Sequence, residues 1–361
     1  MPRALFDILE NHALDENSCF LCGIHLTEEN RSDEHIFPEW LQHKFDLWNQ
    51  TLTLLNGTTI PYRQLYIPSC RQCNNEHLSN LERRIGTGIF ELNGSTRLPS
   101  THDLFLWVGK ILFGIIYREL LLPLNRADPS SQSIVDRSVV QKFRMLHFFL
   151  QSIRVSMRFH CANTAFPASV FTFDLQCPET STARFDFKDN PVNQTIYLRL
   201  GTKGILAAFD GGAQEAVVGD LFRRDATQKL HPLQFEELGA KLFYKASLAT
   251  RVPYFLIAEN AGFHDVILLS MDDSDNPSRV RAAQHASGAV LFQAIPPANE
   301  TVPSFFRDWD QKLYAQFLSA FSGVPLEVVN PAGNQVMTWL RDDANRFKLI
   351  DIRVQPYRGV P

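Results

Sequence analysis

The sequence lacks several features that would assign a protein class at once. It has no large excess of one charge, since 35 Lys and Arg face 39 Asp and Glu for a formal net charge of −4. This balance excludes a generally basic nucleic-acid coat protein. No internal repeat, low-complexity run or glycine-rich phosphate loop is present. The 361 residues, 45% of them hydrophobic and 20% charged, indicate an ordinary globular protein of two or three domains.

Long uninterrupted apolar runs are also missing. The best candidate, residues 104–122, is interrupted by Lys110, Arg118 and Glu119. A charge near the centre of a membrane-spanning helix is costly, so we expect a buried core helix here. The first residues show no signal-peptide pattern. We therefore expect no membrane association and a cytoplasmic location.

Cysteine is scarce, with six residues, but four of them form two CxxC pairs. Four thiolates in two such pairs suit a tetrahedral structural Zn²⁺, which needs four soft ligands and no open position. Disulfides are the competing interpretation, and the missing signal-peptide pattern and the length of the chain argue against them. We expect the isolated Cys161 and Cys177 to be buried as small hydrophobic residues. The predicted zinc ligands are Cys19, Cys22, Cys70 and Cys73.

An acidic and histidine-containing segment lies between the two pairs. It reads Asp33-Glu34-His35-Ile36-Phe37-Pro38, and Asn74 and Asn75 follow directly after the second pair. A carboxylate beside a histidine, with an amide nearby, suits a second, hard cation such as Mg²⁺ or Mn²⁺ that takes part in chemistry. The segment therefore predicts a catalytic metal site next to a structural one.

Together these motifs resemble the HNH endonucleases of the ββα-metal class, over about residues 15–90. A zinc-containing subgroup in bacterial and phage genomes is the nearest likeness, through DEHIFP, SCRQCNN and the downstream Leu81-Glu82. The resemblance implies that His35 is the general base and that Glu34 and Asn74 bind the catalytic cation. Phosphodiester hydrolysis needs such an activated water and such a cation on the scissile phosphate.

Several residues have a second interpretation. Asp33 is expected in the second coordination shell, and Asn75 and His77 are close alternatives to Asn74. Alone, His35 would be interpreted as a satisfied core histidine, and the two asparagines as caps of a helix. The sequence departs from the family at Glu34, where Asp or His is commoner. It also lacks a clear counterpart of the family's middle asparagine.

The pattern of apolar residues predicts the elements around the motifs. We expect a short helix over 3–12, a strand over 34–37 and a hairpin around Asn56-Gly57. A helix is expected from 74 to 85, stopped by Gly86 and Gly88, with a linker over 89–102. Two long helices, 103–122 and 137–158, then precede a strand-rich block. The expected fold class is α+β, with a nuclease domain at 1–95 and a larger mixed α+β domain at 96–361.

The expected function is a metal-dependent HNH endonuclease acting on DNA in preference to RNA. By analogy with fused nucleases of bacterial anti-phage defence, the larger domain would gate it as a regulatory, sensor or assembly domain. A protein partner, a small-molecule activator or a homo-oligomer would act through that domain. Residues 1–100 carry eight basic and thirteen acidic residues, so their own field does not attract a polyanion. The alternative function is a non-catalytic zinc-knuckle module that binds nucleic acid or protein within a larger complex.

Overall fold

The protein has a mixed helix and sheet structure, which confirms the predicted α+β class. A computed structural model describes residues 5–8, 14–90, 99–161, 167–176, 185–215, 219, 222, 229–249, 254–260, 263–269, 289–293, 310–330, 333, 336 and 338. The chain forms two compact units, one of residues 1–166 and 254–296 and one of residues 167–253 and 297–361. Within the described ranges, no helix combines the length and the apolar character that crossing a membrane requires.

The first unit begins with two antiparallel strands that come from distant parts of the sequence. Strand β1 (Arg31–His35) pairs with β4 (Tyr66–Cys70), so that Arg31 lies opposite Cys70 and His35 opposite Tyr66. Between them lie α1 (Glu39–Lys44), the hairpin β2 (Thr51–Thr53) and β3 (Thr59–Pro61), and the short turn η1 (Tyr62–Gln64). The hairpin confirms the Asn56-Gly57 prediction, with Gly57 at a φ of 79°.

A helix follows β4 without a break. It starts as the π-helical segment η2 (Cys73–Leu78) and continues as α2 (Ser79–Phe90). The prediction that Gly86 and Gly88 end it is wrong. At Gly86 a Cβ atom would only make ordinary contact with Trp40, at 3.7 Å, so this glycine sits in regular helix against a neighbour and is not a cap.

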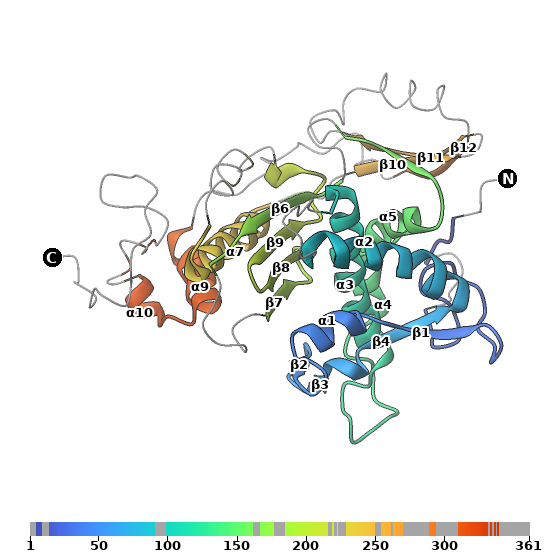
Figure 1. Ribbon diagram of the computed structural model, residues 1–361, viewed down its shortest axis with the longest axis horizontal. Helices are drawn as coiled ribbons and strands as arrows, with labels where there is room; N and C mark the ends of the chain where they lie inside the picture. Colours follow the sequence, from blue (N-terminus) through green and yellow to red (C-terminus); the bar gives the residue numbers. More distant parts are fainter. Residues whose placement is uncertain are drawn as a thin grey trace. The chain divides into compact units, whose positions relative to one another are not determined.

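Helix α3 (Thr101–Leu121) confirms the predicted buried helix. Its N-cap Ser100 accepts a hydrogen bond from the backbone N–H of Asp103, which satisfies a donor that the first turn leaves free. The indole rings of Trp40 and Trp107 stack at 6.3 Å between centroids. At Gly114 a Cβ atom would lie 3.0 Å from Ile36, so glycine lets the helix approach the residue that follows β1 closely. Figure 1 shows α3 beside β4 and α2.

The second predicted long helix, 137–158, is wrong in its extent. The chain forms α4 (Arg137–Lys142), α5 (Arg144–Leu150) and the turn η3 (Gln151–Ile153), and then strand β5 (Met157–His160). Strand β5 runs parallel to β11 (Phe263–Leu269), in a sheet that continues to β10 (Tyr254–Asn260) and β12 (Ala289–Gln293). The short helix expected over 3–12 is absent from residues 5–8, and its other residues lie outside the described part.

This grouping of elements differs from the division predicted between residues 95 and 96. Helix α3 and the sheet β12-β10-β11-β5 belong to the same compact unit as the cysteine pairs. The reason is packing, because α3 is buried along most of its length and contacts both α2 and β4.

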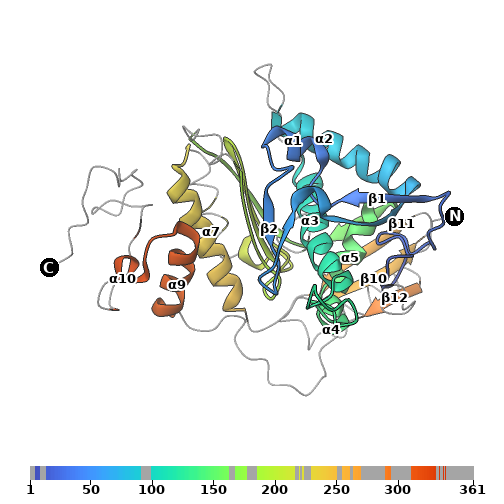
Figure 2. The same cartoon turned by 90° about the horizontal axis from the view of Figure 1, so that it is seen from below.

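The second unit consists of an antiparallel sheet covered by helices. Its strand order is β6 (Ser169–Asp174), β9 (Lys203–Ala208), β8 (Thr195–Leu200) and β7 (Phe185–Asn190). Helix α7 (Pro232–Ser247) packs on β8 and β9, and α9 (Gln311–Ser322) packs on α7 and is followed by α10 (Leu326–Val329) (Figure 2). The aromatic ring of Tyr197 stacks on Phe235 and meets Phe321 edge-on, which joins the layers.

Candidate functional site

The two CxxC pairs meet at one end of the β1–β4 pair. The first lies in a tight loop in which Gly23 has a φ of 72°, and its N–H donates to the carbonyl of Cys19 at 2.8 Å. A left-handed residue is needed to turn the chain back over so few residues, and glycine takes it at no steric cost. The N–H of Phe20 donates to the carbonyl of Pro68 at 2.9 Å, which fixes this loop against β4. The second pair spans the end of β4 and the start of η2.

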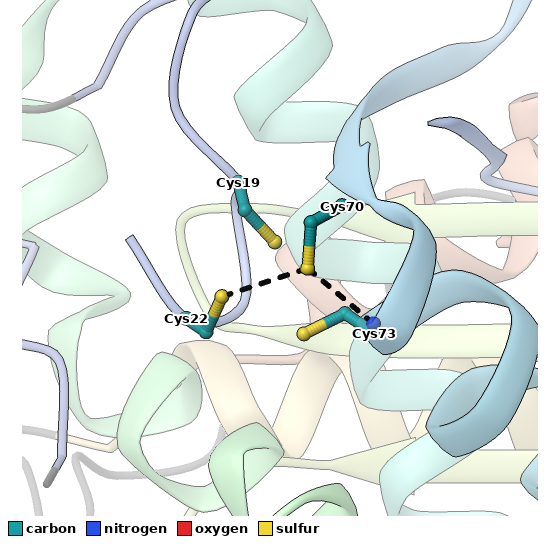
Figure 3. A group of neighbouring side chains, drawn as sticks. All are labelled: Cys19, Cys22, Cys70 and Cys73. Carbon is teal, nitrogen blue, oxygen red and sulfur yellow. Dashed lines mark hydrogen bonds between the residues drawn. The ribbon is translucent and has the colours of Figure 1, made fainter. Parts of the chain in front are cut away.

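The four thiol groups point toward one another, as Figure 3 shows. Their sulfur atoms all lie within 4.8 Å of one another, and Cys22 Sγ and Cys70 Sγ are 3.8 Å apart. A tetrahedral site with metal–sulfur bonds of about 2.3 Å requires sulfur–sulfur distances of about 3.8 Å. Among the described residues, this is the only group of three or more His, Cys, Asp or Glu close enough to hold a metal ion. The cysteines could therefore bind a metal ion such as zinc.

Hydrogen bonds within the group shift the pKa values of its four thiols in both directions. Hydrogen bonds from Cys22, and then from Cys70 and Cys73, hold the pKa of Cys19 well below its ordinary value. The backbone N–H of Cys73 also donates to Cys70 Sγ at 3.4 Å. The same contacts raise the pKa values of Cys22 and Cys73. The thiolate, which is the form that binds metal, is therefore favoured at Cys19 and Cys70. Cys161, predicted to be buried, is half-buried, and Cys177 lies outside the described residues.

Glu34 and His35 lie next to each other on β1 and so face opposite sides of the strand pair. The Glu34 side chain points inward and is buried at 3% exposure, whereas the side chain of His35 keeps 25% of its surface exposed. Strand geometry alone therefore separates the predicted metal ligand from the predicted base. The Glu34 carboxylate and the His35 ring therefore do not face a common site.

The carboxylate of Glu34 meets a lysine from α3. Lys110 is fully buried, and its ammonium binds Glu34 Oε1, Glu82 Oε1 at 2.8 Å, and the backbone carbonyl of His35 at 2.8 Å. Glu82 lies on α2, so a single ammonium joins α3, α2 and β1. Two carboxylates share one cation in this cluster.

Burial sets the protonation of the cluster. It raises the pKa of Glu34 from 4.5 to about 8, a rise that Lys110 opposes and Glu82 increases. Burial also acts against the charge of Lys110, but the two carboxylates outweigh it and raise the pKa of Lys110 above its ordinary value. Lys110 therefore keeps its proton. The surplus negative charge is relieved when Glu34, the more deeply buried acid, takes up a proton.

The imidazole of His35 lies on the outer side, beside α1. Its Nδ1 is 3.5 Å from Glu39 Oε1, and its ring lies 6.4 Å from that of Trp48. The ring of His43 stacks on the ring of Trp48, with 5.0 Å between their centroids. A carboxylate beside Nδ1 favours the tautomer that leaves Nε2 as the basic nitrogen. Glu39 was missed from the sequence because the short helix α1, which places it four residues after His35, was not predicted.

Asn74 holds β1 through its side-chain amide. Its Nδ2 donates to Ser32 Oγ at 2.8 Å and to the carbonyl of Asp33 at 3.0 Å. The predicted ligand Asn74 is therefore fixed next to the acidic strand, with its nitrogen rather than its oxygen toward β1. Of the alternatives, Asn75 is exposed and His77 is half-buried on η2.

Asp33 shares the outer face with His35, because the two residues are two positions apart on β1. Its side chain is 43% exposed and lies 3.5 Å from Arg31 Nε. The carboxylate that lies on the same face as the predicted base is thus Asp33, which the sequence placed in the second shell.

A second group of polar residues is buried in the other unit, between the sheet and α7. Arg199 on β8 is 5% exposed, and its Nε and Nη2 have no hydrogen-bond partner. Oε2 of Glu236 on α7 is likewise buried and unpartnered. Burial raises the pKa of Glu236 to about 7, while Lys188 opposes the rise. Groups of this kind are commonly completed by ordered water or by a bound molecule.

Comparison with known proteins found no matching family model, no similar curated protein and no similar solved structure.

Proposed function

We propose that this protein is a metal-dependent endonuclease of the HNH type that hydrolyses phosphodiester bonds in DNA. The observation that carries the proposal is the order of elements around the cysteines. Two antiparallel strands, β1 and β4, are followed directly by a helix, and the four cysteines close one end of this unit. His35 lies at the opposite end of β1, partly exposed. This is the strand–strand–helix arrangement that the ββα-metal resemblance implies.

In this proposal His35 acts as the general base. Its ring is accessible to a water molecule, and Glu39 on α1 lies near Nδ1, so that Nε2 can accept the proton of the attacking water. Glu39 would then do for His35 what a bracing asparagine does in the family. A general base of this kind contributes about 10²–10⁴-fold to the rate.

A bound Mg²⁺ or Mn²⁺ would stabilise the charge on the scissile phosphate. Glu34 and Asn74 remain its predicted ligands, but the pairing of Glu34 with Lys110 makes this donor set an incomplete fit. Asp33 offers a carboxylate on the face of His35, which makes it the rival ligand. Comparing the Mg²⁺ dependence of cleavage in Asp33→Asn and Glu34→Gln distinguishes the two, because loss of a ligand raises the Mg²⁺ concentration needed for half-maximal rate.

Nicking of supercoiled plasmid DNA tests the proposal directly. The full-length protein is incubated with plasmid and Mg²⁺ or Mn²⁺ at low salt, with a parallel single-stranded RNA substrate. We expect divalent-ion-dependent nicking of DNA that His35→Ala lowers at least about 100-fold. His25→Ala is the matched control, since His25 is an exposed histidine of the same unit. Equal nicking by the His35→Ala variant would refute the role of His35.

We infer that Zn²⁺ occupies the cysteine group and supports folding of the unit. The sulfur–sulfur spacing supports this, and structural zinc ions contribute folding energy directly. The ion is not expected to take part in cleavage, because four thiolates leave no open coordination position.

The second unit is proposed to regulate the nuclease, as expected for a gated effector of bacterial anti-phage defence. Its support is the buried polar group around Arg199 and Glu236. A small polar activator could complete these unpartnered atoms. A protein partner or formation of a homo-oligomer are the other proposed triggers. Candidate activators are added to the nicking assay, and the one that increases the cleavage rate identifies the trigger.

One observation favours a second function, that of a non-catalytic zinc-knuckle module which binds nucleic acid or protein. The predicted ligand Glu34 is engaged by Lys110 and faces away from His35. A purely structural Glu34 needs no catalytic cation. Binding of DNA or RNA without cleavage under any divalent ion would favour this module over the nuclease.

A further inference from the structure

Helix α3 carries a full positive charge into the apolar core of the first unit. Lys110 has no exposed surface, and it lies among the buried residues Val108, Ile111 and Leu112 of the same helix. Moving an ammonium group out of water is strongly unfavourable unless it is paired and hydrogen-bonded. A lysine in this place therefore has a defined set of partners.

The partners of Lys110 match the three N–H groups of an ammonium. One binds Glu34, one binds Glu82 at 2.8 Å, and one binds the carbonyl oxygen of His35 at 2.8 Å. The two carboxylates balance the charge. The third bond has a different consequence, since it goes to the backbone of the proposed general base itself.

The contact with His35 lies where β1 ends. The next residue, Ile36, donates its N–H to the carbonyl of Leu65 at 2.9 Å, and α1 begins at Glu39. The direction of the His35 ring is thus set by a backbone segment that leaves the strand. Lys110 holds the carbonyl on one side of this segment, and Glu39 lies beside the ring on the other.

We propose that Lys110 is a positioning residue for His35: it fixes the end of β1 from α3 and so sets the place of the imidazole. This inference rests on the proposed function for its catalytic consequence. Its structural part, that Lys110 controls the surroundings of the His35 ring, stands independently of cleavage. It also makes α3 a part of the nuclease unit, although α3 lies outside the residues that resemble the family.

The test uses the full-length protein with Lys110→Met, which keeps the unbranched side chain to within one atom of its length and removes the charge. The exposed residue Lys142, changed in Lys142→Met, serves as the matched control. Two readouts are taken. The first is the imidazole ¹³C–¹H signal of His35 at a fixed pH, assigned by its loss in His35→Gln. The second is plasmid nicking, analysed for kcat and KM separately.

We expect the His35 signal to move in Lys110→Met while that of His231, in the second unit, stays in place. We expect kcat to fall about 10-fold or more with KM within about 2-fold, since misplacing a reacting group slows chemistry without weakening binding. Lys142→Met should match the wild type in both readouts.

The outcomes separate the two claims. An unmoved His35 signal in a folded Lys110→Met variant, with unchanged kcat, overturns the positioning role. A moved signal in a protein that never cleaves supports positioning and removes the proposed function. If Lys110→Met does not fold, Lys110→Met/Glu82→Gln replaces it, because this variant leaves a single carboxyl group that can be buried in its neutral form. The same signal shift is expected there, and its absence overturns the proposal.

Discussion

Replacing Glu34 with glutamine should change how the stability of the protein depends on pH. Glutamine has the same shape and can still accept a hydrogen bond from Lys110, but it carries no charge. Glu34→Gln therefore converts two carboxylates sharing one ammonium into a single Glu82–Lys110 pair, with a distance of 2.8 Å between Nζ and Oε1. The variant removes the surplus negative charge without opening a cavity.

The sign of the effect follows from the raised pKa of Glu34. Burial raises it from 4.5 to about 8, so between these pH values the folded protein holds a proton that the unfolded chain releases. The stability that this group contributes is present in acid and is lost as the pH rises through the window. The whole shift corresponds to about 5 kcal/mol at 1.36 kcal/mol per pH unit, which is an upper limit because two carboxylates share the proton. We expect a measured loss of about 1–3 kcal/mol.

Urea unfolding followed by tryptophan fluorescence from pH 5 to pH 8 measures this loss, since Trp40 and Trp107 stack in the same unit. The free energy of unfolding of Glu34→Gln relative to wild type should rise by about 1–3 kcal/mol between pH 5 and pH 8. Glu28→Gln, an exposed carboxylate in the same unit, should follow the wild type at every pH. A constant difference between Glu34→Gln and wild type would show that Glu34 stays ionised in the fold, and the argument for the cluster would fail.

Two further predictions concern the metal and the extent of the unit. Metal analysis of purified protein should find about one zinc per chain, and Cys70→Ser should lose it and expose residues 15–90 to proteolysis, while Cys161→Ser keeps it. Full zinc retention by Cys70→Ser would contradict the assignment. A fragment of residues 1–100 should lack cooperative unfolding by circular dichroism, because it leaves Glu34 and Glu82 buried without Lys110 and removes the α3 packing surface. A sharp cooperative transition of that fragment would show that α3 is dispensable.

The meeting of the four cysteines was predictable because their information is local. Two CxxC pairs and a glycine after the first pair specify loops with little dependence on the rest of the chain, and the four sulfur atoms meet as expected. The hairpin at Asn56-Gly57 was predictable for the same reason, since Gly57 adopts the positive φ that this tight turn needs.

The surroundings of Glu34 were not predictable from the motif, because they depend on a residue 76 positions away. The motif places Glu34 beside His35, whereas strand geometry turns their side chains to opposite faces. Lys110 entered the sequence analysis only as an interruption of an apolar run. The division of residues 137–158 into two helices, a turn and a strand likewise depends on pairing of β5 with β11, more than 100 residues later.

A charged residue inside an apolar helical run does more than argue against a membrane-spanning helix. When such a helix is buried, the charge must find a partner, so Lys110 predicts at least one carboxylate at a buried position of another element. In the structure these carboxylates are Glu34 and Glu82, both of which pair with Lys110. Once Glu34 is assigned to Lys110, its role as a cation ligand is weakened, and the outer face of β1, with Asp33, His35 and the neighbouring Glu39, becomes the better place to look for the chemistry. The charge in α3 thus redirects the interpretation of a motif that lies far from it in the sequence.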